Sequence, residues 1–330
     1  IQEDVHQNIF FASYSSDHLY YLKNDTVSAY PKEFSSGYFY LGGLQSQNGL
    51  NYFTTRRGVT VYNGKSFSEL DLPEPEAVLS VFEDTIHSKL YFGSYKGLFI
   101  KDKFGAYQHN NDFIKGKEEV LLKIVKNKKG ELWFITKKQF GSIDEFGNII
   151  NQNKQIKDAL SLHSDTRGNL WIGTMNGFYF YDYRRLTQIN HPELKRMIGS
   201  VIKADNKHLV YGGLRGIGML DLDKFYQIYT NIKKDITVIN AEDFVNYYSN
   251  SHGFMGEEVG QNGMFKDSKN RIWIPTNTNV VAFNPQTLKT NLKTPRTYIT
   301  KIEASQDNIN WTNLNNTGAL NYTKNNRFKF

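Results

Sequence analysis

The sequence contains no cysteine among its 330 residues, which excludes disulfides and any zinc site built on thiolates. That absence is compatible with a reducing compartment and also with a bacterial periplasm. No run of about 18 apolar residues occurs, so the sequence predicts no membrane-spanning helix. The formal net charge is +7 without any basic tract, so we expect no nucleic-acid contact from this segment.

Catalytic and metal-binding patterns are also lacking. The eight histidines never fall at H-x-x-x-H spacing. The segment 93–97 has the glycines of a nucleophile elbow but places its serine wrongly. Ser164 and Asp165 are adjacent, whereas a sialidase-type Asp-box needs one residue between them. We therefore expect no catalytic residue, no metal and no cofactor, and we expect this segment not to be an enzyme.

The chain has no initiator Met and opens on Ile1 inside a strand pattern, so we expect it to be a piece of a longer protein.

What it does have is abundant aromatic residues, at 15%, together with many turn-forming residues. The stretch 165–182, DTRGNLWIGTMNGFYFYD, shows the pattern best. It predicts two short strands joined by a tight turn, with Asn176 and Gly177 taking positive φ as in a type I′ hairpin.

This pattern recurs along the chain. Segments equivalent to the one at Leu170 begin at Ile9, Asn51, Leu90, Leu132, Leu170, Leu209 and Ile272. Five of the six intervals are about 40 residues, and the sixth is longer, which indicates an insertion at about 230–262. Each unit contains four strand patterns. The repeat therefore predicts an all-β fold, a seven-bladed β-propeller of four-stranded blades over 1–292, with a pair of β-sandwiches as the alternative.

Three tryptophans occupy one equivalent position of the repeat: Trp133, Trp171 and Trp273. A blade cannot bury both faces of its sheet alone, so neighbouring blades must stack. We expect these rings to form the core between blades rather than platforms for a sugar.

The repeat resembles a known family. Residues 165–182 match the two-component-regulator propeller repeat, D-x-x-G-x-L-W-I-G-T-x-x-G-L-x-x-Y-D, almost position for position. Residues 84–102 and 267–284 match well, while 1–22 and 44–62 match loosely and carry Phe10 and Tyr52 in place of the tryptophan. Residues 293–330 resemble the beginning of the Y_Y_Y (triple-tyrosine) domain, an immunoglobulin-like β-sandwich.

The resemblance implies a periplasmic sensor region of a Bacteroides-type transmembrane two-component regulator. Such sensors respond to oligosaccharides and control polysaccharide-utilisation genes. It also implies a homodimer, with the transmembrane helix and a histidine kinase or DNA-binding output outside this chain. Two rivals stay open. One is a propeller that serves only as a scaffold for dimerisation or partner binding, with the sensor site in an N-terminal propeller outside this chain. The other is a propeller lyase or glycosidase.

Propeller topology predicts where a ligand would bind. The turns between the second and third strands share one face with the connections between blades, and four of six such turns carry Lys or Arg. Arginine and lysine gathered at one end of a channel would attract an anionic oligosaccharide. The candidate residues are Arg56, Arg57, Tyr95, Lys96, Lys137, Lys138, Asn176, Arg215 and Asn277, with Glu257 and Glu258 from the insertion. The alternatives are ordinary soluble turns, a face for a partner protein, and an insertion that acts as a packing latch.

Overall fold

The computed structural model describes residues 1–12, 18–30, 40–73, 77–112, 119–233, 236–287, 303–305, 312–313 and 327–329. The chain forms two compact units, Ile1–Gln286 and Thr287–Phe330. Each unit is considered by itself below.

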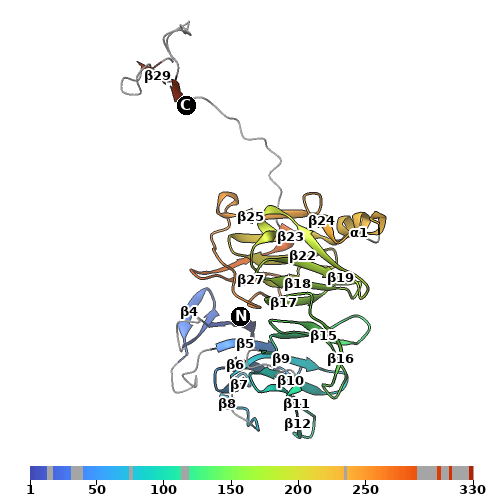
Figure 1. Ribbon diagram of the computed structural model, residues 1–330. Helices are drawn as coiled ribbons and strands as arrows, with labels where there is room; N and C mark the ends of the chain where they lie inside the picture. Colours follow the sequence, from blue (N-terminus) through green and yellow to red (C-terminus); the bar gives the residue numbers. More distant parts are fainter. Residues whose placement is uncertain are drawn as a thin grey trace. The chain divides into compact units, whose positions relative to one another are not determined.

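The first unit consists of seven sheets whose main strands are antiparallel and follow one another in the sequence (Figure 1). The first four sheets contain β1 (Gln2–Glu3), β2 (Ile9–Ala12), β3 (Leu19–Lys23) and β4 (Thr26–Ala29); β5 (Tyr40–Gln45), β6 (Asn51–Thr55), β7 (Gly58–Tyr62) and β8 (Phe67–Glu69); β9 (Val78–Asp84), β10 (Lys89–Ser94), β11 (Gly97–Lys101) and β12 (Tyr107–Asn110); and β13 (Lys123–Lys126), β14 (Leu132–Ile135), β15 (Phe140–Ile143) and β16 (Ile149–Asn153). The last three contain β17 (Ala159–Ser164), β18 (Leu170–Thr174), β19 (Gly177–Tyr181) and β20 (Leu186–Asn190); β21 (Ile198–Lys203), β22 (His208–Gly213), β23 (Gly216–Asp221) and β25 (Val245–Ser249); and β26 (Phe265–Lys266), β27 (Ile272–Pro275) and β28 (Val280–Phe283).

The predicted seven-bladed propeller is confirmed. All seven repeat starts lie in the second strand of a sheet, from β2 to β27. The first and last blades meet, because the backbone amide and hydroxyl of Ser268 donate to the Glu3 carboxylate at 2.8 and 2.9 Å. These contacts close the ring between residues far apart in the sequence.

The core between blades is aromatic, as expected. Trp133, Trp171 and Trp273 are 5%, 0% and 7% exposed. Each indole N–H donates to an acidic side chain from the turn before its strand: Trp133 to Glu131, Trp171 to Asp165 and Trp273 to Asp267. The repeat thus pairs a buried ring with an acceptor for its one polar group, which explains why both residue types recur together.

The turns between second and third strands differ from the type I′ prediction. The turn of blade 5 consists of Met175 and Asn176, and Gly177 is already paired with Thr174 in the ladder. Asn176 is not among the residues with positive φ. The Thr174 hydroxyl accepts from the Asn176 amide and donates to the Gly177 carbonyl, so this hydroxyl closes the turn instead of paired positive φ angles.

The insertion also differs from its predicted position at about 230–262. Extra residues begin directly after β23, as α1 (Leu222–Asn231) and β24 (Val238–Asn240). The strand β24 pairs parallel to β20, so a segment of blade 6 adds a fifth strand to blade 5. Residues 245–249 then return as the fourth strand of blade 6. Much of the insertion is therefore a latch between two blades.

Short 3₁₀ turns occur at η2 (Pro192–Lys195), η3 (Asn250–His252) and η4 (Pro285–Thr287). In the second unit the described residues form one small antiparallel sheet, with β29 (Glu303–Ser305) between β30 (Thr312–Asn313) and β31 (Arg327–Lys329). The rest of the expected immunoglobulin-like sandwich lies outside the described residues. In the described part of the chain, no helix has the length and apolar character needed to cross a membrane.

Candidate functional site

The predicted ligand-binding turns lie at exposed tips of the propeller. The predicted residues there are exposed at Arg56, Arg57, Tyr95, Lys96, Lys137, Lys138, Asn176, Arg215 and Asn277. The amide of Ala159 donates to the Lys137 carbonyl, and that of Met175 donates to Asp158, so the connection into blade 5 lies against two of these turns. We call this side of the ring the turn face. The corresponding turn of blade 1, at 13–17, lies outside the described residues.

The cations of the turn face belong to separate blades. Tyr95 is 51% exposed beside Lys96, whose amide is held by the Ser94 hydroxyl at 3.0 Å. Burial, followed by the Glu193 carboxylate, raises the pKa of Tyr247 to about 12. The Arg215 guanidinium lies close enough to Tyr247 to oppose this increase. The turn face is therefore a set of exposed charges at blade tips, and the two pockets described below are lined by other residues.

The segment that enters the last blade lies against the inner strands of blades 4, 5 and 6 on this face. We call residues 256–263 the crossing segment. The Asn262 amide group donates to the Leu160 carbonyl of blade 5 at 2.9 Å and lies 3.4 Å from that of Leu122 in blade 4. Its backbone amide donates to Gly199 of blade 6. One residue of blade 7 thus bonds to three other blades, which ties the crossing segment to the inner strands of the ring.

The acidic candidates lie on this crossing segment. Glu257 and Glu258 are exposed, and the Glu258 amide donates to the Leu214 carbonyl of the blade 6 turn. Phe254, which precedes these carboxylates in the insertion, is 7% exposed and packs in the core of blades 6 and 7. The two carboxylates therefore share the turn face with the predicted cations, whereas the aromatic ring of Phe254 does not reach it.

The inner strands of blades 4 to 6 carry buried basic groups that the sequence reading did not single out. Burial lowers the pKa of Lys123. Burial, followed by the charges of Lys123 and Lys203, lowers the pKa of His163 to about 4, so this imidazole is neutral at pH 7. Its buried Nε2 atom has no hydrogen-bond partner.

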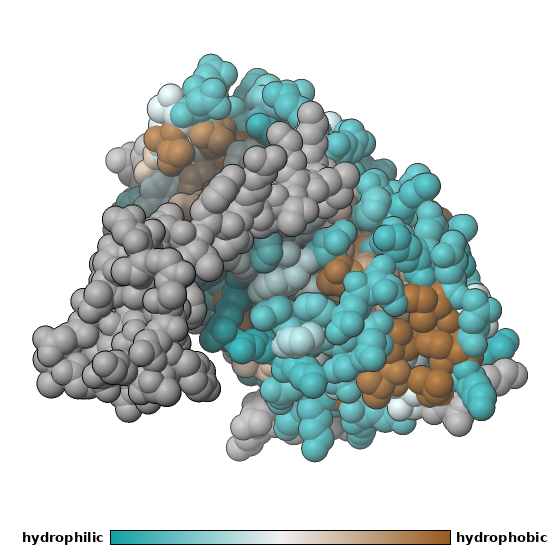
Figure 2. All heavy atoms as spheres, turned by 90° about the horizontal axis from the view of Figure 1, so that it is seen from above, coloured by the Kyte–Doolittle hydropathy of each residue, from teal (hydrophilic) through white to brown (hydrophobic). Residues whose placement is uncertain are grey.

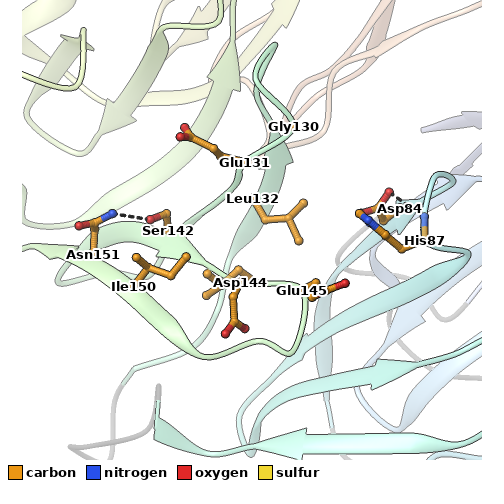
Figure 3. A pocket seen from close by; sticks show the side chains of 11 residues that line it. Asp84, His87, Gly130, Glu131, Leu132, Ser142, Asp144, Glu145, Ile150 and Asn151 are labelled. Carbon is orange, nitrogen blue, oxygen red and sulfur yellow. Dashed lines mark hydrogen bonds and ion pairs between the residues drawn. The ribbon is translucent and has the colours of Figure 1, made fainter.

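One pocket of about 280 Å³ lies between blades 3 and 4 (Figure 3). In Figure 3, the Asp84–His87 pair and the Asn151–Ser142 pair border opposite sides of this pocket, with Leu132 between them. Asp144, also in its lining, accepts from the amides of Phe146 and Asn148 at the tip of blade 4. That carboxylate is occupied in holding its turn.

Asp84 is the most strongly perturbed carboxyl in that pocket. Burial by itself would raise its pKa, but hydrogen bonds from His87 and Lys126, each 2.8 Å long, outweigh burial and lower the pKa to about 2. Asp84 is therefore an ionised carboxylate in a structural ion pair at neutral pH, not a proton donor.

A second pocket, of about 290 Å³, lies between blades 4 and 5. It combines the aromatic rings of Trp133, Tyr181 and Tyr183 with the side chains of Asn151 and Asn153. None of these was a predicted site residue. The signal available in the sequence was Tyr183, which follows directly after the repeat pattern that ends at Asp182.

Comparisons with known proteins add to this geometry. No protein-family model matches the sequence, and no curated protein does either. Among solved structures, the extracellular domain assigned to a hybrid two-component system of B. thetaiotaomicron matches with a TM-score of 0.75 at 16% identity, over 92% of this chain and 41% of that one. The chain shares its fold with that extracellular domain.

The propeller also resembles enzymes. Virginiamycin B lyase from Staphylococcus aureus matches with a TM-score of 0.67 at 14% identity, over 86% of this chain and 92% of that one. Hydrazine synthase of Kuenenia stuttgartiensis matches with a TM-score of 0.63 at 11% identity, over 84% and 92%. At these identities the likeness shows the propeller fold alone.

The surface of the propeller is largely polar. Figure 2 shows one side of the molecule on which hydrophilic residues dominate and hydrophobic residues gather in separate patches. Exposed apolar side chains include Ile86, Phe104 and Phe146, all in turns at the ends of blades 3 and 4. Lys89 covers the Phe146 ring at 5.1 Å, which partly shields it from solvent.

Proposed function

We propose that this chain is the ligand-sensing, extracytoplasmic region of a transmembrane two-component regulator, and that its ligand is an oligosaccharide. The observation that carries the proposal is the match of 92% of the chain to the extracellular domain of a hybrid two-component system. The repeat sequence at 165–182 resembles that of the same class of regulators. Because this chain spans 41% of that neighbour, the output domain, the membrane anchor and the periplasmic location are proposals too.

For the ligand contact we propose two parts of the surface. The first is the turn face, where Arg56, Arg57 and Arg215 project from blades 2 and 6 and would bind acidic groups of a long glycan. Exposed cations of this kind act over about 8–10 Å at ordinary salt, so their contribution is salt-sensitive. The second is the pocket between blades 4 and 5, which is argued below.

Signalling would require two arrangements of the sensor that differ in affinity for the ligand. A ligand moves such an equilibrium only by the difference between its two affinities. In a homodimer, a ligand that binds one arrangement of the propellers more tightly would shift the C-terminal unit with it. The rigid ring, closed between Glu3 and Ser268, would transmit such a shift as a body.

Calorimetric titration of neutral and anionic oligosaccharides at two salt concentrations tests this proposal. We expect an anionic oligosaccharide to bind the turn face more weakly at the higher salt concentration, and Arg56→Ala/Arg57→Ala to weaken it about tenfold. Lys65→Ala, at an exposed position outside the turn face, serves as the control. Binding that is equal in both variants and at both salt concentrations would remove the turn face from the site.

One observation favours the scaffold alternative. The crossing segment bonds to blades 4, 5 and 6 on the turn face and so occupies surface there that a ligand would otherwise contact. If no saccharide binds while the chain associates with itself or a partner protein in sedimentation experiments, the scaffold function replaces the sensor function.

A further inference from the structure

The blade 4–5 pocket can be compared with the equivalent space between blades 5 and 6, the next pair of blades in the ring. Between blades 5 and 6, the helix α1 covers Trp171 with Phe225, whose ring centroid lies 4.8 Å from that of the indole. Tyr226 from the same helix donates to Asp165, and Arg167 stacks over the Tyr226 ring at 3.8 Å. The space between blades 5 and 6 is therefore filled by α1 of the chain itself.

The equivalent space between blades 4 and 5, around Trp133, repeats part of this arrangement. Tyr183 takes the position of the helix tyrosine: its hydroxyl accepts from Asn127 at 2.8 Å, and Lys129 lies over its ring at 4.8 Å. In the repeat, Asn127 and Lys129 correspond to Asp165 and Arg167. The third strand of blade 5 ends without a helix, however, and a cavity of about 290 Å³ remains beside Trp133.

Tyr183 adopts an unusual backbone conformation to reach this position. Its φ is +70°, in the left-handed region that a non-glycine residue rarely occupies. The ring lies 5.2 Å from Trp133 and 5.6 Å from Tyr181, measured between centroids, and its hydroxyl donates to the Gly168 carbonyl. Backbone strain that presents a side chain to a cavity is typical of binding sites.

Polar groups face this aromatic wall from the outer strand of blade 4. Asn151 and Asn153 are two residues apart on β16, so they project to the same side of the sheet; both line the blade 4–5 pocket, and Asn151 also borders the blade 3–4 pocket. The Asn151 amide donates to the Ser142 hydroxyl and the Asn153 carbonyl accepts from the Gln155 amide, each at 2.9 Å, so the remaining N–H groups and the Asn151 carbonyl face a ligand. The Glu131 carboxylate, exposed at the edge of the same pocket, adds acceptors.

We propose that the pocket between blades 4 and 5 binds one ring of a neutral saccharide. This inference rests on the proposed sensor function and assigns it a site. A pyranose ring has an apolar face for the tyrosine rings and a rim of hydroxyl groups that donate and accept, which matches the two amides and the carboxylate. A pocket volume near 300 Å³ is at the low end for small-molecule sites and suits one sugar ring of a longer chain.

The charge in the pocket selects against acidic sugars. Glu131 is its one carboxylate, and it accepts from Asn127 and Trp133 through Oε2. Lys129, its one cation, is stacked on Tyr183. An acidic sugar would place its charge beside the carboxylate without gaining a guanidinium partner, so a neutral ring is favoured.

The test is calorimetric titration of the whole chain with neutral disaccharides (cellobiose, maltose, xylobiose and mannobiose) and with digalacturonate. We expect a neutral disaccharide to bind the wild-type chain and Asn151→Ala/Asn153→Ala to weaken it at least about tenfold, since each hydrogen bond lost is worth roughly two- to tenfold. Asn153→Trp places a large ring in the cavity and should abolish binding. Asn206→Ala, an exposed asparagine of blade 6, should leave it unchanged.

The outcomes separate this inference from the sensor function. Saccharide binding that survives both Asn151→Ala/Asn153→Ala and Asn153→Trp would overturn the pocket and keep the sensor. Binding of digalacturonate alone would do the same. No binding by any saccharide would overturn both. Melting curves of the variants identify any loss of binding that is due to unfolding. If the double variant is unfolded, the binding result with Asn153→Trp decides the question.

Discussion

The hydroxyl of Tyr226 gives the sharpest prediction about what fastens the latch to the ring. It donates to the Asp165 carboxylate at 2.5 Å and accepts from the Asn169 side chain at 2.6 Å. The change Tyr226→Phe removes this hydroxyl and keeps the ring under Arg167. The carboxylate keeps its bonds from Trp171 and from the Arg167 amide, so one charged hydrogen bond is removed from a site that stays folded.

The expected cost follows from the kind of bond. A hydrogen bond to a charged group contributes about 1.5–3 kcal/mol to stability. We expect Tyr226→Phe to lower the free energy of unfolding by about 2 kcal/mol. With a slope of roughly 3 kcal/mol per molar urea for a chain of this size, the midpoint should fall by roughly 0.7 M.

Urea unfolding followed by tryptophan fluorescence measures this shift. Tyr179→Phe is the control, because Tyr179 is a half-buried tyrosine on blade 5 whose hydroxyl has no bond to a carboxylate among the described residues. A double-mutant cycle with Asp165→Asn isolates the pair and should give a coupling energy of about 1 kcal/mol or more. A loss no larger than that of Tyr179→Phe would refute the reasoning and show that the hydroxyl contributes nothing to the latch.

Three further predictions concern acid stability, a turn and the crossing segment. The depressed pKa of Asp84, about 2 when folded, contributes about 2 kcal/mol that is present above pH 4 and is lost as the pH falls from 4 to 2; thermal melts should show this loss, and in Lys126→Met, which raises the folded pKa of Asp84, the loss should be smaller and complete at a higher pH, whereas identical acid profiles would contradict the ion pair. Gly97→Ala should lower the free energy of unfolding in urea by about 1–3 kcal/mol, because φ is +114° and a Cβ would lie 2.3 Å from a backbone oxygen. Gly105→Ala, where a Cβ would meet open space, has only the cost of its positive φ and should lose about 1 kcal/mol. Equal losses in the two variants would refute the steric part of the argument. Asn262→Ala should speed hydrogen exchange in the crossing segment by about tenfold, and unchanged exchange there would show that its side-chain bonds do not hold the segment.

The blades could be predicted from the sequence because each strand pattern is local and repeats. The apolar run seen in Leu170–Thr174, with an aromatic residue at its second position in most blades, was enough to place the second strand of every blade. The ring closure followed from the number of repeats. These features depend on short-range patterning, which single sequences carry well.

The helix α1 was missed although its pattern is present. Leu222, Phe225, Tyr226 and Tyr229 have the spacing of one helix face, and Asp221 accepts from the Lys224 amide as an N-cap. Because Asp221 also ends a strand in the repeat, its capping role was not visible from the repeat alone. The turn type was missed for a similar reason, since the Thr174 hydroxyl replaces the conformation that Asn-Gly usually supplies.

The candidate site could be predicted only in part. Topology placed Arg56, Lys137 and the other turn residues at exposed blade tips, where the structure has them. It could not predict the crossing segment, whose bonds join Asn262 to residues more than 100 positions away. Nor could it predict the blade 4–5 pocket, which depends on the positive φ of Tyr183 and on the absence of a helix there.

The most direct test of the central claim is a crystal structure of the protein with the saccharide that binds most tightly in the titrations. The sensor account predicts density for the sugar against residues 1–286, at the turn face or in the pocket lined by Tyr181 and Asn151. Saccharide density only outside the propeller, or a propeller that stays empty at saturating ligand, would contradict it and leave the propeller as a scaffold.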